Sequence, residues 1–77
     1  MPTLVDLKLG QSATITDCSS EAIPFKLLEM GCLPGNRVKL LQVAPFLDPI
    51  YLNIDDAFVA IRRETAALIR IEFDPDE

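Results

Sequence analysis

The chain has 77 residues, enough for one domain with a small hydrophobic core. Hydrophobic residues make up 49% of the sequence, so we expect some apolar side chains to stay exposed and to favour self-association or docking on another protein. The formal net charge is −5, which argues against binding to nucleic acid phosphates or to an anionic membrane surface.

The targeting and redox features of the sequence favour the cytoplasm. Residues 1–6 carry neither the basic region nor the apolar run of a signal peptide, and no stretch approaches the roughly 18 apolar residues of a membrane span. Cys18 and Cys32 are too few for a disulfide framework and lack the spacing of a zinc site. We therefore expect a soluble cytoplasmic protein without membrane insertion, whose two cysteines are reduced and largely buried.

The first third of the chain predicts one strand and one helix. A lead-in over residues 4–10 ends at a glycine, and alternation over residues 13–17 predicts the first strand. Apolar residues at helical spacing over residues 23–30 predict a short helix of about two turns. Gly31 follows where a helix end favours a left-handed residue.

The middle of the chain predicts a turn and a bent strand. Residues 34–36 (Pro-Gly-Asn) are typical of a tight turn. Residues 37–43 alternate and then change phase at Leu40-Leu41, which predicts a bulge or sharp bend within this second strand. Pro45 ends the strand because a proline cannot donate a hydrogen bond to the sheet.

The last third predicts three more strands. Residues 50–54 and 57–61 alternate on either side of Asp55-Asp56, a pair that fits a two-residue hairpin connection. Residues 64–67 are compatible with one helical turn, and residues 68–73 alternate again. The side chains expected to face inward in the third and fifth strands are those of Ile50, Leu52, Ile54, Ile69, Ile71 and Phe73.

These elements predict a mainly β fold, a small five-stranded barrel with one short α-helix inserted after the first strand. So short a sheet can cover its apolar face only by curling on itself, and the helix would close one open end. We expect a single domain over residues 1–77, with a core of about 4–73 and an acidic tail over 74–77.

Four blocks of residues, in the same order, resemble the FeoA family. The blocks are Leu4-x-x-Leu7-x-x-Gly10, Leu28-x-Met30-Gly31-x-x-Pro34-Gly35, Ala44-Pro45-x-x-Asp48-Pro49-Ile50 and Ile61-Arg62-Arg63-x-x-Ala66-x-x-Ile69-x-Ile71. The resemblance implies an SH3-like barrel and an accessory or regulatory role in ferrous iron transport. Its implied partner is the cytoplasmic side of an FeoB-type transporter, a membrane protein with a GTP-binding domain.

Catalysis and metal binding have little support in the sequence. The chain has no histidine and no phosphate-binding P-loop, so we expect neither an enzyme nor a cofactor. Iron would prefer imidazole or thiolate ligands, but Cys18 and Cys32 are 14 positions apart without partners at ligand spacing. Transition-metal binding is thus weakly indicated, and the acidic terminus (Asp74, Asp76 and Glu77) is expected to be solvated.

Most of the motif residues have structural explanations. Leu28, Met30, Gly31, Pro34, Gly35, Ala44 and Pro45 fit core, cap and turn positions. Arg62 and Arg63 could act on a nucleotide in trans, but pairing of one arginine with a nearby acid is the favoured interpretation.

The candidate partner-binding residues lie in and after the loop that follows Pro45: Phe46, Leu47, Asp48, Pro49 and Tyr51. The chain has Phe46-Leu47 where members of the family usually carry a glycine. Two large apolar residues there either anchor a partner, or one packs on the barrel while the other is merely exposed.

Two other functions stay open at this point. The chain could be the barrel module of a metal-dependent transcriptional regulator, although it is acidic and has no helix-turn-helix pattern. It could also be a generic protein-interaction barrel, although Tyr51 is its only tyrosine and it has no tryptophan.

Overall fold

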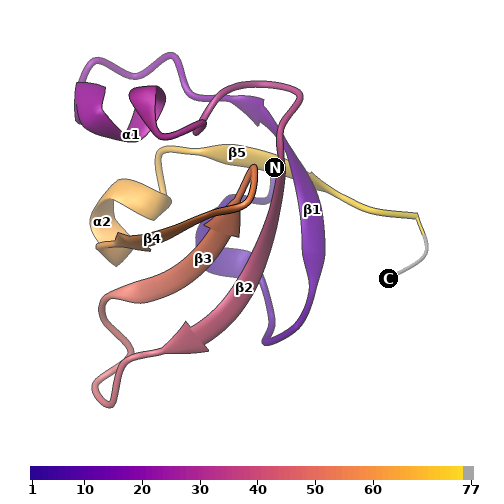
Figure 1. Cartoon of the computed structure of the whole chain (residues 1–77), viewed down its shortest axis with the longest axis vertical. Coiled ribbons are helices and arrows are strands. Elements are labelled where there is room, and N and C mark those ends of the chain that lie inside the picture. The colour runs from indigo at the N-terminus through magenta and orange to yellow at the C-terminus, as the bar shows by residue number, and fades with distance from the viewer. Residues whose placement is uncertain (76–77) are drawn as a thin grey trace.

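The computed structural model describes residues 1–75; Asp76 and Glu77 of the expected acidic tail lie outside the described residues. Figure 1 shows the course of the chain. Its elements are the 3-10 helix η1 (Leu4–Asp6), β1 (Ser12–Asp17), α1 (Phe25–Glu29), β2 (Arg37–Val43), β3 (Ile50–Ile54), β4 (Ala57–Ile61), α2 (Arg63–Ala66) and β5 (Arg70–Phe73).

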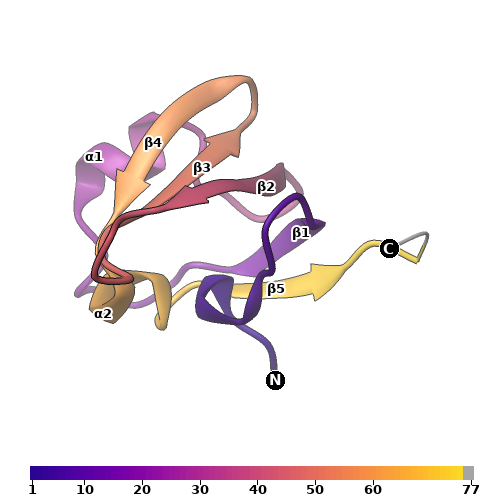
Figure 2. The ribbon, with the colours of Figure 1, turned by 90° about the horizontal axis from the view of Figure 1, so that it is seen from below.

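The five strands form one antiparallel sheet in the order β4-β3-β2-β1-β5. The sheet curls on itself, so that β2, β3 and β4 make one layer and β1 and β5 the other (Figure 2). This arrangement confirms the predicted mainly β architecture with five strands.

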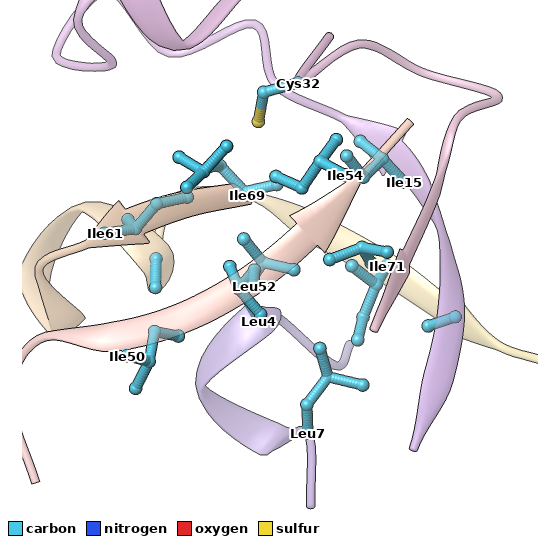
Figure 3. Packing of buried hydrophobic residues seen from close by; sticks show 14 of the residues in the cluster. Leu4, Leu7, Ile15, Cys32, Ile50, Leu52, Ile54, Ile61, Ile69 and Ile71 are labelled. Carbon is cyan, nitrogen blue, oxygen red and sulfur yellow. The ribbon is translucent and has the colours of Figure 1, made fainter. Parts of the chain in front are cut away.

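A single hydrophobic core fills the space between the two layers (Figure 3). Its centre is β3, where Ile50, Leu52 and Ile54 are at most 2% exposed, as the alternation predicted. Ile69 and Ile71 also face inward. The prediction was wrong for Phe73, which is 37% exposed because it is the last residue of β5 and only part of its ring is covered.

The predicted irregularity of the second strand is present. The register between β2 and β3 shifts between Leu40 and Gln42, which is a bulge at Leu41. Leu40 is buried, and the extra residue leaves Leu41 40% exposed on the outer face. The bulge lets β2 bend, so that it pairs with β3 in one layer and with β1 in the other.

The connection between β3 and β4 is the predicted two-residue hairpin. Asp55 and Asp56 both have positive φ (50° and 67°), as a type I′ turn requires. The Asn53 side chain accepts a hydrogen bond from the Asp56 N–H at 3.2 Å. Ile54 and Ala57 are therefore the hydrogen-bonded pair that closes the turn. Because hydrogen-bonded and non-hydrogen-bonded pairs alternate along antiparallel strands, this pair fixes which residues of β4 direct their N–H and C=O groups toward β3.

Helix α1 is shorter than its sequence pattern, and α2 is shifted along the chain. Helix α1 covers five residues, because the buried Ile23 precedes it and Met30 caps its end. Helix α2 is the expected helical turn, but it begins at Arg63, one residue before the predicted range of 64–67. Its last turn continues through hydrogen bonds from Leu68 N–H to Thr65 C=O (2.9 Å) and from Ile69 N–H to Ala66 C=O (3.2 Å), so β5 begins at Arg70.

The two edge strands of the sheet, β5 and β4, differ in whether another segment of the chain bonds to them. The N-terminal segment covers β5, since Leu4 N–H donates to Ile69 C=O and Ile71 N–H donates to Pro2 C=O, both at 3.1 Å. Strand β4 pairs only with β3, so within residues 1–75 its outer edge has no strand partner.

Candidate partner-binding surface

The loop between β2 and β3 is fixed at its base. Ala44 N–H donates to Pro49 C=O at 3.1 Å, and Leu47 N–H donates to Ala44 C=O at 2.8 Å. Asp48 Oδ1 accepts the Arg63 N–H at 2.9 Å, which connects the loop to the start of α2. The peptide bond between Asp48 and Pro49 is cis. The loop is thus held in one shape by bonds that leave its tip free.

The tip presents two apolar side chains to solvent. Phe46 is 92% exposed and Leu47 is 64% exposed. Leu47 also has φ 69°, a left-handed conformation that is uncommon for a leucine. Neither residue belongs to the core cluster or to the partly buried residues packed against it, which disfavours the alternative in which one of them packs on the barrel. Burying either side chain against a partner would contribute about 1.5–3 kcal/mol.

Arg62 and Arg63 both contact Asp48, but in different ways. The Arg62 side chain lies 3.8 Å from Asp48 Oδ2, which is the expected pairing of one arginine with a nearby acid. This pair contributes at most about 1 kcal/mol, because the Arg62 side chain is 69% exposed. Arg63 contributes its backbone N–H, so the two residues position the loop from α2.

Tyr51 does not belong to the tip of this loop. It lies on the outer face of β3, opposite Gln42 of β2 and Ala60 of β4. There it lines a shallow hollow with Leu41 and Phe58, and we call these three residues the outer patch. The structure therefore divides the predicted partner-binding residues between the loop, with Phe46 to Pro49, and the outer patch.

Phe58 was not among the predicted site residues, although it is 76% exposed. Val59 and Ile61 of the same strand are buried. Because side chains alternate along a strand, a core position for Val59 and Ile61 already places Phe58 and Ala60 on the outside. That alternation could have identified Phe58 from the sequence.

The motif residues near the end of α1 have the structural roles that were expected. Gly31 and Gly35 have φ of 103° and 96°, values that favour glycine. The Asn36 side chain donates to the Gly31 C=O at 2.6 Å and holds the two turns together. Met30 is half-buried and packs against the core.

The described part of the chain contains no group of three or more His, Cys, Asp or Glu side chains that could hold a metal ion. Asp74 was expected to be solvated, but it forms an ion pair with Arg37 and its side chain is only 14% exposed. This contact holds the end of β5 near β2; Asp76 and Glu77 lie outside the described residues.

The two cysteines are buried, as expected, and both are free thiols. The Cys18 thiol donates to the Cys32 C=O at 3.1 Å. Burial raises the pKa of Cys32 to about 11. Burial and the charge of Asp17 also raise the pKa of Cys18. Both thiols are therefore neutral at pH 7, where a thiolate would be needed for metal binding or nucleophilic reactivity.

The raised pKa of Cys32 predicts that the protein loses stability at alkaline pH. Above about pH 9 the unfolded chain ionises this thiol while the folded chain keeps it protonated, so the stabilisation falls as the pH rises toward 11. We expect a loss on the order of 1–2 kcal/mol from this group. Urea unfolding at several pH values between 8 and 11 measures it.

Cys32→Ala is the control for this effect. The variant should be less stable at neutral pH because a buried atom is lost, but its stability should fall less steeply between pH 9 and 11. Identical pH slopes in the two proteins would contradict the assignment to Cys32.

Across residues 1–75, no helix is both long and apolar enough to cross a membrane.

The five-stranded antiparallel sheet that curls on itself places the protein among the small SH3-like β-barrels. The family model of the FeoA domain matches residues 3–73. The chain belongs to the FeoA family, which is linked to Fe(2+) transport.

Solved structures agree with this assignment. The solution structure of the FeoA protein from Chlorobium tepidum has a TM-score of 0.89 and 30% identity, and the match covers 99% of this chain and 73% of that one. The crystal structure of Stenotrophomonas maltophilia FeoA complexed with zinc, described as an SH3 domain protein, has a TM-score of 0.75 at 23% identity, covering 94% and 91%. The latter likeness supports the fold alone.

A curated relative carries the same domain within a much longer chain. It is the Fe(2+) transport protein A/Fe(2+) transporter FeoB fusion protein of Porphyromonas gingivalis strain W83, which is 39% identical over 70 residues. The match covers 90% of this chain, and this chain spans only 8% of the length of the fusion protein.

Proposed function

We propose that this protein is an accessory subunit of a bacterial ferrous iron transport system that binds the cytoplasmic side of an FeoB-type transporter. The observation that carries the proposal is the fusion protein, which joins a relative of this chain to a transporter of that type. Two domains on one polypeptide are held at a high effective concentration, and a separate chain must replace that tether with an interface. The role is binding, without catalysis and without a cofactor.

The loop tip is the part of the molecule best suited to such an interface. Phe46 and Leu47 are exposed on a base that is already ordered, so docking would cost little conformational entropy. Apolar and aromatic anchors of this kind contribute most of the energy of an interface. Asp48 and Pro49 keep the loop in shape, and the outer patch with Tyr51 offers a second apolar area.

The test uses the soluble GTP-binding domain of the transporter and the double variant Phe46→Asp/Leu47→Asp. We expect the variant to bind at least about 30-fold more weakly, because the loss of one such anchor costs about 2 kcal/mol or more. Isothermal titration calorimetry with GDP and with a GTP analogue measures the affinity and shows whether nucleotide state changes it.

Leu9→Asp is the matched control, since Leu9 is 67% exposed but lies outside the loop. It should bind like the unmodified protein. The far-ultraviolet circular dichroism of all variants should be unchanged. Equal affinity of the double variant and the unmodified protein would remove the loop from the interface, and no binding of the unmodified protein would refute the direct contact.

A further inference from the structure

The outer edge of β4 carries backbone groups that point away from the sheet. The register pairs Ile54 with Ala57 across the two-residue turn, so Ala57, Val59 and Ile61 direct their N–H and C=O groups toward β3. Phe58 and Ala60 then direct theirs outward. None of the backbone hydrogen bonds found within residues 1–75 uses these four outward groups.

Proteins usually protect such an edge, and the described residues protect the β5 edge but not the β4 edge. The N-terminal segment lies along β5 and bonds to Ile69 and Ile71. Within the described residues 1–75 nothing comparable covers strand β4, and the strand carries no proline or charged residue that would discourage pairing. An uncovered, apolar strand edge is a template for another extended segment.

A groove lies along this edge. It has a volume of about 400 Å³, with residues of β4 on one side and Lys26, Leu27 and Met30 from the α1 region on the other. Phe58 and Ala60 also line the hollow beside the outer patch, so the groove and the patch meet at β4. A helix on one side and a strand edge on the other leave a channel for one extended chain segment.

The charged residues that line the groove are basic. Lys26 and Arg62 line it, and no carboxylate of the described residues does so; Asp48, which lies 3.8 Å from the Arg62 guanidinium, is outside the groove. The whole chain carries a net charge of −5, so this positive strip differs from the rest of the molecule. An occupant with carboxylate side chains would complement it.

We propose that the groove binds an extended segment of a partner protein, rich in apolar and acidic residues, which adds to the sheet as a strand beside β4. The segment would form hydrogen bonds with the N–H and C=O groups of Phe58 and Ala60. A side chain of the segment that lies over Ala60 has room because alanine projects little, and the side chain two residues along the segment packs on the exposed ring of Phe58. A carboxylate of the segment would lie near Lys26 or Arg62.

This site goes beyond the proposed contact with the transporter, because it uses none of the exposed side chains of the Phe46–Leu47 tip. The same edge could in principle pair with β4 of a second copy. We favour a single extended segment of a partner because β4 of a second copy has no acidic residue to lie near Lys26 and Arg62. Self-pairing is therefore one of the outcomes that the test separates.

The test follows backbone amides of the full chain by nuclear magnetic resonance. Without a ligand, the amides of Phe58 and Ala60 should exchange with solvent much faster than those of Val59 and Ile61, which donate to β3. The probe is a short acetylated peptide of alternating valine and glutamate. Adding it should shift the resonances of Phe58, Ala60 and Lys26 and slow the exchange of the first two.

Three control peptides separate the backbone and charge contributions. Two of them carry N-methyl groups on one or the other alternate set of backbone nitrogens, so that only one of the two loses the donors that face β4. The third has lysine in place of glutamate, which reverses the charge. The lysine analogue and the N-methyl peptide that lacks the strand-pairing donors should each bind at least about 10-fold more weakly, equivalent to the loss of one or two good contacts.

The variant Ala60→Pro removes a backbone N–H donor from the outer edge of β4. Proline is tolerated where an edge N–H faces solvent, so the ladder with β3 should survive. We expect at least about a 10-fold loss of affinity for the valine–glutamate peptide. Phe46→Asp/Leu47→Asp should bind this peptide normally, which separates the groove from the loop.

Several results would overturn the proposal. These are the absence of any shift at millimolar peptide, shifts confined to other strands, and equal binding of both N-methyl peptides and the unmodified peptide. Slow exchange of the Phe58 and Ala60 amides that strengthens with protein concentration, without peptide, would instead show a dimer paired through β4. If Ala60→Pro does not fold, the N-methyl peptides decide the question with the unmodified protein.

Discussion

Replacing Leu52 by alanine should lower the free energy of unfolding by about 3 kcal/mol. Leu52 is fully buried at the middle of β3, the strand that lies between β2 and β4. Its removal leaves a cavity that the surrounding strands, tied together by their hydrogen bonds, cannot close. A domain of 77 residues has a total stability of about 4–11 kcal/mol, so this one change would remove a large part of it.

Leu41→Ala is the matched control for this prediction. It deletes the same atoms, but Leu41 is 40% exposed at the bulge of β2. The cost should be below about 1 kcal/mol. Urea unfolding followed by circular dichroism measures both values, and a cost for Leu52→Ala no larger than that for Leu41→Ala would contradict the assigned core.

Replacing Gly31 by alanine should cost about 2–3 kcal/mol, for two separate reasons. The φ of 103° is outside the region that alanine adopts readily. An added Cβ would also lie 3.2 Å from the Cβ of Asp55, in the turn between β3 and β4. The first reason is local, whereas the second depends on how the end of α1 approaches the hairpin.

Gly35→Ala separates these two contributions. Gly35 has a similar φ of 96°, but nothing lies within 4 Å of an added Cβ there. We expect this variant to lose about 1–2 kcal/mol, from the backbone strain alone. Thermal and urea unfolding of both variants give the difference, which measures the contact with Asp55.

A second change should relieve the crowding at Gly31. Asp55→Gly removes the nearby Cβ, and its φ of 50° is acceptable for glycine. The double variant Gly31→Ala/Asp55→Gly should recover about 0.5–1 kcal/mol relative to the sum of the single changes. Strict additivity would show that the two residues do not crowd each other in solution.

The sequence by itself determined the strands and their inward faces to a large extent. Alternation placed Ile50, Leu52 and Ile54 in the core, and the phase change at Leu40-Leu41 located the bulge. These predictions succeed because a side-chain period of two residues is a local property, which the pattern of apolar residues records directly.

The ends of elements were less predictable. The β5 strand starts later than its alternation suggests, because the turn of α2 continues through Leu68 and Ile69. Phe73 continues the inward pattern of β5 but is partly exposed. Coverage at the end of a strand depends on neighbours from other parts of the chain, and a local pattern holds no information about them.

The candidate binding surfaces were also only partly predictable from the sequence. The sequence identified Phe46 and Leu47 as two apolar residues in one loop, but only the tertiary structure decided that both side chains face solvent. The base of this loop is held in part by the Arg63 N–H, which donates to Asp48 from another element of the chain. The open edge of β4 was likewise decided by the order of the strands. Which strand ends a sheet, and which edge the N-terminal segment covers, follow from long-range pairing that no local pattern specifies.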